Sequence, residues 1–130
     1  MQMGNRIDEI KKMLKTDPND SFLTYALALE HEKSGDSKEA IRIIEELNRQ
    51  DPEYIGSYYK LGQLYENNKQ LDKDISVYRS GIKLADKKKD FKAKGELEEA
   101  LWLIEEEWKD SYNYFLSISF YHKSLFNNSL

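Results

Sequence analysis

The feature of this sequence that most constrains its fold is an Asp-Pro pair that occurs twice, 34 positions apart, at residues 17–18 and 51–52. Shifting the chain on itself by this distance superimposes residues of similar size over a whole unit: Tyr25 on Tyr59, Leu27 on Leu61, Ala28 on Gly62, Ile41 on Ile75 and Ile44 on Tyr78. Self-similarity at a period of about 20–50 residues is typical of repeat proteins, whose units bury a continuous core by stacking. The sequence therefore predicts a stacked array.

Proline explains why the pair divides the chain. It has no backbone N–H to donate within a helix, and it pushes the preceding residue out of the α region. Pro18 and Pro52 are therefore predicted to mark breaks between helices. Asp17 and Asp51 precede them, where a short polar side chain can cap the next helical turn.

A second break is expected inside each unit. In the first unit, Gly35 follows an apolar helical stripe, as is typical just after the end of a helix. In the second unit this place falls to Asn67 and Asn68, and asparagine tolerates the left-handed conformation. Each unit is therefore predicted to be a pair of helices, with Ala28 and Gly62 small enough to let the paired helices approach closely.

The pattern resembles the tetratricopeptide repeat, a helical unit of about 34 residues that reads Trp-x₂-Leu-Gly-x₂-Tyr, then Ala-x₃-Phe, then Pro. The second unit reads Tyr58-x₂-Leu61-Gly62-x₂-Tyr65 and Asp74-x₃-Tyr78, and the first reads Thr24-x₂-Leu27-Ala28-x₂-His31, Ala40-x₃-Ile44 and Pro52. Departures from the family are Thr24 for the large aromatic, His31 for tyrosine, Asp74 for alanine and Asp86 for a third proline. The resemblance implies an all-α fold, an antiparallel helix-pair solenoid wound as a right-handed superhelix.

The start of the array follows from the same register. Ile10 lies eight residues before Pro18, as Ile44 lies eight residues before Pro52. Residues 4–16 are therefore predicted to be the second half of a repeat.

Two full repeats are predicted over residues 21–52 and 55–86, followed by a boundary near Asp90. Apolar residues then recur at steps of three or four over residues 91–108, with glutamates between them. This spacing predicts an amphipathic helix that covers the last repeat and turns its glutamates mostly to water. Gly95 weakens a helix by about 1 kcal/mol relative to alanine, so the helix could start after it.

Residues 111–130 form an aromatic C-terminal tail of different composition. Apolar residues alternate there with period two, as in a strand, but Tyr112, Leu116 and Phe120 also lie on one side of a helix. The helical context favours a further helix that follows a cap at Asp110 or Ser111.

The aromatic side chains of the tail are expected to be buried against another surface, because burying each ring stabilises the folded state by on the order of 1.5–3 kcal/mol. Packing of the tail on the preceding helix, with Trp102 or Trp108 as partners, is favoured because short connections place neighbours together. Exchange of the tail between two copies ranks second. Occupation of the groove as an autoinhibitory plug ranks third.

Composition excludes several classes of function. The 20 Lys+Arg and 24 Asp+Glu residues give a net charge of −4, which favours neither a nucleic-acid nor a membrane partner. The absence of cysteine removes disulfides, thiol nucleophiles and thiolate metal sites. The sequence contains no apolar run of about 18 residues and no secretory leader, so we expect a soluble, cytoplasmic chain.

The sequence offers little for catalysis. His31 and His122 are the two histidines of the chain and its candidates for a base at neutral pH, and they lie far apart in sequence. His31 takes the place of a packing tyrosine, which favours a structural role, and the glutamate runs are typical of a solvated helix face. We predict no enzyme activity, no catalytic residue, no cofactor and no metal site.

The resemblance implies a concave groove lined by the first helix of each pair, and such grooves bind extended or helical peptides. The residues expected on its surface are Phe22, Tyr25, Leu29, Glu32, Lys33, Tyr59, Gln63, Glu66 and Asn67. The family's clamp for acidic C-terminal peptides of chaperones needs Lys, Asn and Arg where this chain has Tyr25, Leu29, Tyr59 and Gln63, so that function is not expected. Tyr25 and Tyr59 are explained equally well as packing between repeats.

The sequence thus predicts a non-catalytic protein–protein interaction module, an adaptor or scaffold that binds a peptide or partner segment in its groove. The alternative is a self-associating module, a homodimer in which the open end and the aromatic tail pack on a second copy.

Overall fold

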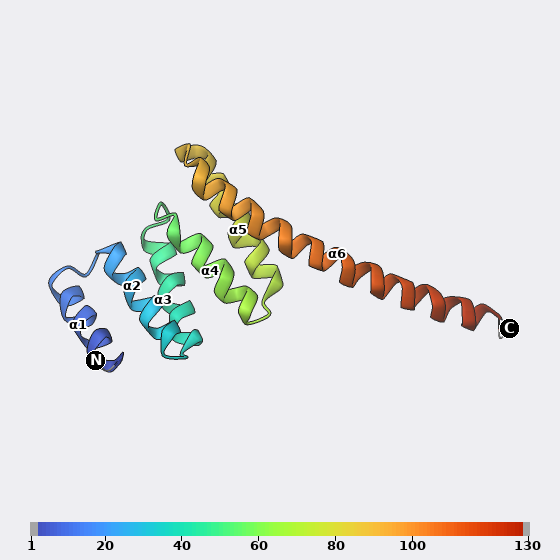
Figure 1. Ribbon diagram of the computed structural model, residues 1–130, viewed down its shortest axis with the longest axis horizontal. Helices are drawn as coiled ribbons and strands as arrows, with labels where there is room; N and C mark the ends of the chain where they lie inside the picture. Colours follow the sequence, from blue (N-terminus) through green and yellow to red (C-terminus); the bar gives the residue numbers. More distant parts are fainter. Residues whose placement is uncertain (1–2, 129–130) are drawn as a thin grey trace.

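The computed structural model describes the backbone of residues 3–128 and the side chains of residues 6–113, 115 and 116. Within this part of the chain there are six α-helices: α1 (Met3–Thr16), α2 (Ser21–Lys33), α3 (Ser37–Gln50), α4 (Gly56–Asn67), α5 (Leu71–Lys88) and α6 (Phe91–Asn128). Each helix packs on the next along the chain, most extensively within the pairs α2–α3 and α4–α5 (Figure 1). The predicted all-α helix-pair solenoid is confirmed.

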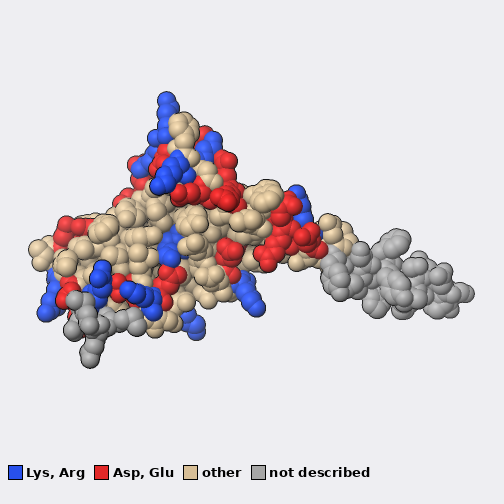
Figure 2. Space-filling model, viewed as in Figure 1, with Lys and Arg blue, Asp and Glu red and all other residues tan. Residues whose placement is uncertain are grey.

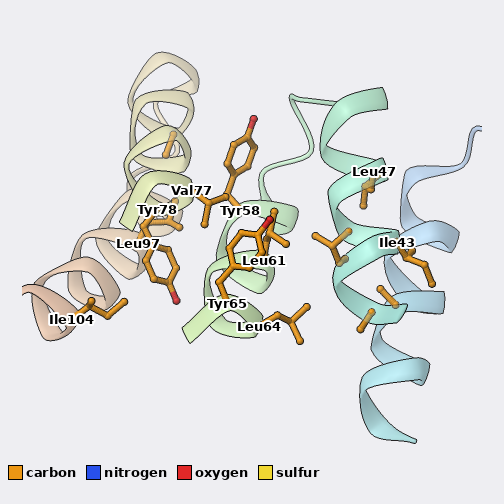
Figure 3. Packing of buried hydrophobic residues seen from close by; sticks show 14 residues of the cluster. Ile43, Leu47, Tyr58, Leu61, Leu64, Tyr65, Val77, Tyr78, Leu97 and Ile104 are labelled. Atoms are coloured by element: carbon orange, nitrogen blue, oxygen red, sulfur yellow. The ribbon is translucent and has the colours of Figure 1, made fainter. Parts of the chain in front are cut away.

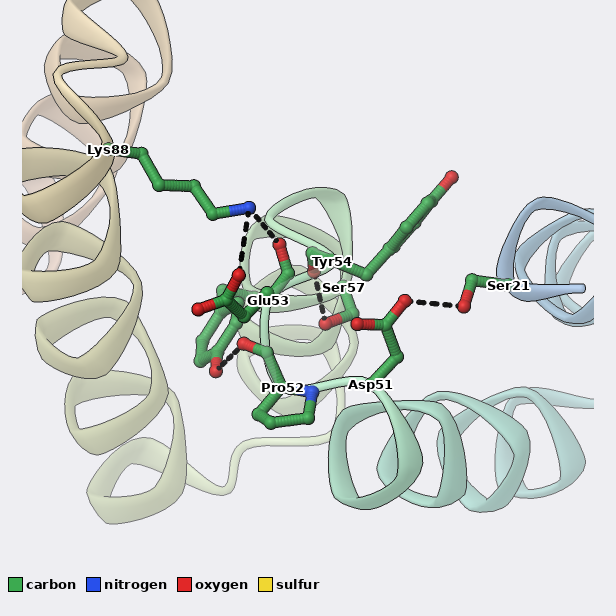
Figure 4. Close-up of polar contacts among 8 residues, drawn as sticks. Ser21, Asp51, Pro52, Glu53, Tyr54, Ser57 and Lys88 are labelled. Atoms are coloured by element: carbon green, nitrogen blue, oxygen red, sulfur yellow. Dashed lines mark hydrogen bonds and ion pairs between the residues drawn. The ribbon is translucent and has the colours of Figure 1, made fainter. Parts of the chain in front are cut away.

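The second Asp-Pro pair opens a tight turn and also ties two helices together. The Asp51 carbonyl accepts a hydrogen bond from the Tyr54 amide at 3.1 Å. The Asp51 carboxylate accepts from the hydroxyl of Ser21, the first residue of α2, at 2.5 Å (Figure 4). The Pro52 carbonyl accepts from the Tyr58 hydroxyl in α4 at 2.5 Å. This joint therefore fixes the starts of α2 and α4 relative to the end of α3.

The prediction that Asp17 and Asp51 cap the following helices is wrong. In α2 the cap is Asp20, whose carboxylate accepts from the Leu23 amide at 3.0 Å. Two or three residues separate each proline from the first residue of the next helix. The aspartate of each pair therefore stands too early in the chain to reach the free amides of the first turn.

Both helix pairs turn over a residue with positive φ, and these residues are also 34 positions apart. Gly35 has φ 89° after α2, and Lys69 has φ 59° after α4. In each turn the following amide donates to the carbonyl five residues earlier, at 2.9 Å and 2.8 Å respectively. Asn67 and Asn68 do not take this place, because Asn67 ends α4 and Asn68 has φ −92°. The repeat thus conserves the turn geometry while its second copy uses a residue for which that geometry is strained.

The last helix, α6, departs from the 34-residue register because α5 is longer than α3, its counterpart in the first pair. α5 has 18 residues and α3 has 14. α5 continues through Asp86, the position at which a third proline would have ended it. α5 ends at Lys88, close to the predicted boundary. Asp90 then caps α6 by accepting from the Ala93 amide at 3.1 Å.

The core runs through the array between neighbouring helices (Figure 3). Its buried apolar side chains come from α2 to α6 and include Ile43, Ile44, Leu47, Tyr58, Leu61, Leu64, Tyr65, Val77, Tyr78, Leu97 and Ile104. Because residues from three consecutive helices meet around Tyr78, α4, α5 and α6 form one packed body.

The tightest contact in this core is between Gly62 of α4 and Tyr78 of α5. A Cβ atom on Gly62 would lie 2.2 Å from Cε1 and 2.4 Å from Cζ of the Tyr78 ring. Real Cβ atoms do not approach another carbon so closely. The sequence-based expectation that paired helices need a small residue here therefore has a specific cause, which is the fully buried Tyr78 ring.

α6 is one continuous helix from Phe91 to Asn128, so the expected break at Asp110 or Ser111 does not occur. Gly95 lies inside the helix rather than before it. After Gly95 the sequence contains neither glycine nor proline, so nothing in the chain interrupts the helical backbone.

The tail accordingly does not fold back on its own helix, and the predicted packing of the tail against Trp102 or Trp108 is wrong. The second half of α6 projects away from α1–α5 (Figure 1). The tail side chains that are described are exposed, with 57% of Tyr112, 63% of Phe115 and 44% of Leu116 accessible. The expected packing of Tyr114, Phe120, Tyr121 and Phe126 falls outside the described side chains.

Two substitutions of the same kind should have opposite effects on stability. Gly62→Ala should lower the free energy of unfolding by about 1–3 kcal/mol, because its methyl group overlaps the Tyr78 ring. Gly95→Ala should raise it by up to about 1 kcal/mol, because the new methyl group meets nothing within 4 Å beyond the adjoining backbone of its own helix, and alanine favours the helix. Urea denaturation of both variants measures the two effects. Equal stabilities would contradict the close contact of α4 and α5.

Candidate functional site

A cavity of about 260 Å³ opens between α4 and α6, with α5 behind it. α4 supplies Tyr59, Gln63 and Glu66, α5 supplies Tyr78, and α6 supplies Glu96, Glu99, Ala100 and Leu103. Three of the residues expected in the groove thus lie together here. Their spacing of three or four positions places them on one face of α4.

A second cavity of about 460 Å³ lies at the end of α4. It is lined by Glu66, Asn67, Lys69, Leu71, Ile104, Glu107, Trp108 and Ser111. Glu66 lines both cavities, and we call the two together the α4–α6 groove. Asn67, a further residue expected from the sequence, lies at its wider end.

The groove combines aromatic walls with negative charge. The ring centroids of Tyr59 and Tyr78 are 6.2 Å apart, at an interplanar angle of 55°. Figure 2 shows acidic side chains gathered along the first half of α6. Glu66, Glu96 and Glu99 line the narrower cavity, which has no Lys or Arg among its described lining residues.

The groove residues expected on α2 lie apart from these cavities. Phe22 is 67% exposed and Lys33 is exposed, whereas Leu29 is half-buried. Tyr25 is also half-buried, with its ring 5.7 Å from that of Tyr54, and burial raises the pKa of its hydroxyl. The α2 surface is therefore partly a packing surface.

An ion pair connects the α2 surface to α4. The Lys60 ammonium lies 2.6 Å from the Glu32 carboxylate, and both side chains are largely buried. Glu32, which the sequence places on the groove side, is thus neutralised by a neighbouring helix.

Sequence reasoning missed the side of the groove that α6 supplies. The glutamates of α6 were expected mostly in water, and Glu96 and Glu99 are indeed exposed, but the sequence did not place them opposite α4. The signal that could have found them is the buried positions Leu97 and Ile104, which orient the helix. Glu96, Glu99 and Leu103 lie beside that buried stripe, at the edge facing α4.

Asp74 is a buried acid at the start of α5, next to the groove. Its side chain is inaccessible to solvent, and neither carboxylate oxygen has a hydrogen-bond partner among the described residues. Burial raises its pKa to about 6, and the nearby carboxylates of Glu66 and Asp72 add to the shift. The family pattern places a small alanine here, so this carboxylate occupies a position that favours an apolar side chain.

The structure gives His31 a structural setting. It lies half-buried near the end of α2, where its carbonyl accepts from the Ser34 hydroxyl at 2.8 Å and from the Asp36 amide at 2.9 Å. His122 falls outside the described side chains. Among the described residues, His, Asp and Glu do not cluster in a group of three that could hold a metal ion.

No helix in residues 3–128 is both long enough and apolar enough to pass through a membrane.

Comparisons with known proteins agree with this architecture. The family model of the tetratricopeptide repeat matches residues 55–88. A tetratricopeptide repeat domain protein from Salinibacter ruber, solved by NMR, is 41% identical over 68% of this chain and 89% of its own, with a TM-score of 0.66. We found no curated protein with significant sequence similarity.

Two further solved structures share the fold at low sequence identity. The TPR2B-domain:pHsp70 complex of yeast Sti1 is 14% identical over 81% of this chain and 84% of that chain, with a TM-score of 0.73. The Sgt2 TPR domain from Aspergillus fumigatus is 17% identical over 85% of this chain and 71% of that chain, with a TM-score of 0.68.

Replacing Asp74 should change how stability depends on pH. Its pKa is raised from 3.8 to about 6 by folding, so the folded state loses stability as pH rises through this interval, by about 3 kcal/mol in full. Asp74→Ala should therefore unfold at higher urea concentration than the wild type at about pH 7.5, and this advantage should shrink at about pH 4. Asp8→Ala is the matched control, because Asp8 is exposed on α1 and is not among the carboxylates that raise the pKa of Asp74. An unchanged pH dependence in Asp74→Ala would contradict the buried, ionisable state.

Proposed function

The chain belongs to the tetratricopeptide repeat family, and from this premise we propose that it is a non-catalytic protein-interaction module that binds a peptide or partner segment on the side formed by α2, α4 and α6. The observation that carries the proposal is the α4–α6 groove. It combines accessible aromatic and aliphatic surface with carboxylate and amide groups, which is the mixture that orients a bound protein segment.

The class of partner is supported by the fold. The TPR2B domain of yeast Sti1, which shares it, is solved as a complex with pHsp70. At 14% identity this likeness carries the fold and not the identity of a ligand. We therefore propose a protein segment as the partner of this chain without transferring the partner of Sti1.

The surface formed by α2, α4 and α6 also argues against an acidic partner segment. The positions of the family's clamp hold Tyr25, Leu29, Tyr59 and Gln63, none of which carries a positive charge at neutral pH. The neighbouring surface of α6 is negative (Figure 2). An acidic C-terminal peptide would therefore be repelled by the surface that the family uses to hold it.

We expect groove substitutions to abolish binding of peptides selected on this protein. A dodecapeptide library displayed on phage should yield peptides that bind the wild-type chain and lose affinity about tenfold or more on Tyr59→Ala/Leu103→Ala, which removes two exposed contact side chains. Phe91→Ala is the matched control, since Phe91 is exposed outside the groove. Fluorescence anisotropy measures the affinities. Selected peptides that bind the double variant as well as the wild type would refute the proposed groove.

The second candidate function is self-association, favoured by the projecting half of α6. Trp108, Tyr112, Phe115 and Leu116 are exposed and lie on one side of the helix. This stripe continues the line of Ile104, which is buried against the body of the array. We propose that a second copy covers the stripe, because its apolar side chains gain free energy when removed from water.

Self-association should depend on the stripe and not on other exposed apolar residues. The full chain should sediment as a dimer at tens of micromolar, and Tyr112→Ser/Phe115→Ser should shift it to a monomer without loss of helicity, because both side chains are exposed. Trp102→Ser serves as the control, because Trp102 is 58% exposed on another side of α6. A monomeric wild-type chain at this concentration would exclude the second candidate.

A further inference from the structure

We propose that the first turn of α5, residues 71–74, is a pH-controlled hinge at the wider cavity of the α4–α6 groove, and that it opens locally when the Asp74 carboxyl becomes charged. The inference goes beyond the proposed function, because it concerns how one wall of the cavity moves and requires no ligand. It follows from a comparison of the two helix pairs at positions that lie 34 residues apart.

The two pairs differ first at the turn between their helices. Gly35 has φ 89° and Lys69 has φ 59°, so both turns need the left-handed conformation. Glycine adopts this conformation without strain, whereas the Cβ atom of a lysine is brought too close to the following carbonyl oxygen. The turn that precedes α5 therefore holds strain that the turn before α3 does not.

The pairs differ next at the cap of the second helix. Asp36 caps α3, since its carboxylate accepts a hydrogen bond from the Glu39 amide at 3.2 Å. Gln70 takes the corresponding position before α5, and its side chain makes no cap. The free amides at the start of α5 therefore lack the side-chain acceptor that stabilises the first turn of α3.

The third difference is the buried residue of the first turn. Ala40 of α3 and Asp74 of α5 occupy corresponding positions, and both are inaccessible to solvent. Alanine suits such a position. Neither carboxylate oxygen of Asp74 finds a hydrogen-bond partner in the part of the chain that the structure describes. Its charged form is therefore much less stable there than its neutral form.

The surroundings of Asp74 also oppose its charge. Burial contributes most to its raised pKa of about 6, and the carboxylates of Glu66 on α4 and Asp72 on α5 add to the shift. The Ile75 amide favours the charged form without offsetting these effects. Tyr78 of α5 keeps its proton, because its own pKa is raised by burial and by nearby carboxylates. At neutral pH the closed turn therefore holds a charge that water would stabilise.

Opening of the first turn is enough to relieve this charge. Asp74 is the fourth residue of α5, so unwinding one turn brings its carboxylate to water, while the buried Val77 and Tyr78 keep the rest of the helix in place. Helix ends open at a lower cost in free energy than the core does. Leu71 lies in the same turn and Lys69 just before it, and both line the wider cavity. The opening therefore moves one wall of the cavity.

Amide hydrogen exchange of the full chain, followed by NMR, measures this opening. The pKa of Asp74 rises from 3.8 in water to about 6 in the closed turn, so the opening equilibrium should increase about tenfold between pH 5 and pH 7.5. The protection factor of the Ile75 amide, corrected for the intrinsic exchange rate, should fall by the same factor. Ile41 takes the corresponding position in α3 and is the internal control, which should show no such fall.

Two variants separate the carboxyl from the weak turn. Asp74→Asn keeps the size of the side chain and cannot ionise, so the protection factor of Ile75 should become independent of pH. Lys69→Gly/Gln70→Ser supplies an unstrained turn and an uncharged cap. It should raise the protection factor of Ile75 at every pH, while the tenfold change remains.

The outcomes decide whether the hinge exists and whether it is local. A protection factor of Ile75 that is equal at pH 5 and pH 7.5 would overturn the proposal, and so would the wild-type change in Asp74→Asn. An equal fall at Ile41 and Ile75 would mean that the whole array opens, which also overturns a hinge confined to α5. None of these results bears on the proposed binding function, because no ligand takes part in the measurement.

Discussion

The contact between Gly62 and the Tyr78 ring is the interaction on which the rest of the structure depends. The ring occupies the space that any side chain on Gly62 would need, so α4 and α5 approach more closely there than paired helices with larger residues could. The same ring packs beside Tyr59 and lies at the back of the α4–α6 groove. One buried aromatic residue therefore both closes the second helix pair and forms the floor of the candidate site.

Much of the array could be predicted from the sequence because the residues that end its helices act locally, on the turn in which they lie. Proline and the 34-residue period place the helix boundaries of both pairs within a few residues, and Gly62 was identified as a point of close approach. Cap and turn residues were less predictable. Asp20 rather than Asp17 caps α2, and Lys69 rather than an asparagine adopts the positive φ, because exact loop length decides which residue reaches the helix end.

The candidate site was half predictable for a different reason. The α4 residues follow from the repeat register, but the α6 residues depend on how α6 packs after a longer α5. Periodicity shows that α6 is amphipathic without showing which edge of its apolar stripe faces α4. The burial of Asp74 is likewise an outcome of packing, since the sequence alone does not show that an aspartate is buried.

The unbroken α6 has a mechanical consequence. Its 38 residues span about 57 Å at 1.5 Å per residue, and the helix passes from the groove into the projecting half without a hinge. A helix also fixes the angle between side chains, at about 100° for each residue of separation. The side chains of α6 in the groove and those in the projecting half are therefore held at a fixed distance and a fixed rotation relative to one another. Because Trp108 belongs both to the groove and to the stripe, a segment in the wider end of the groove and a second copy on the stripe would compete for this one side chain.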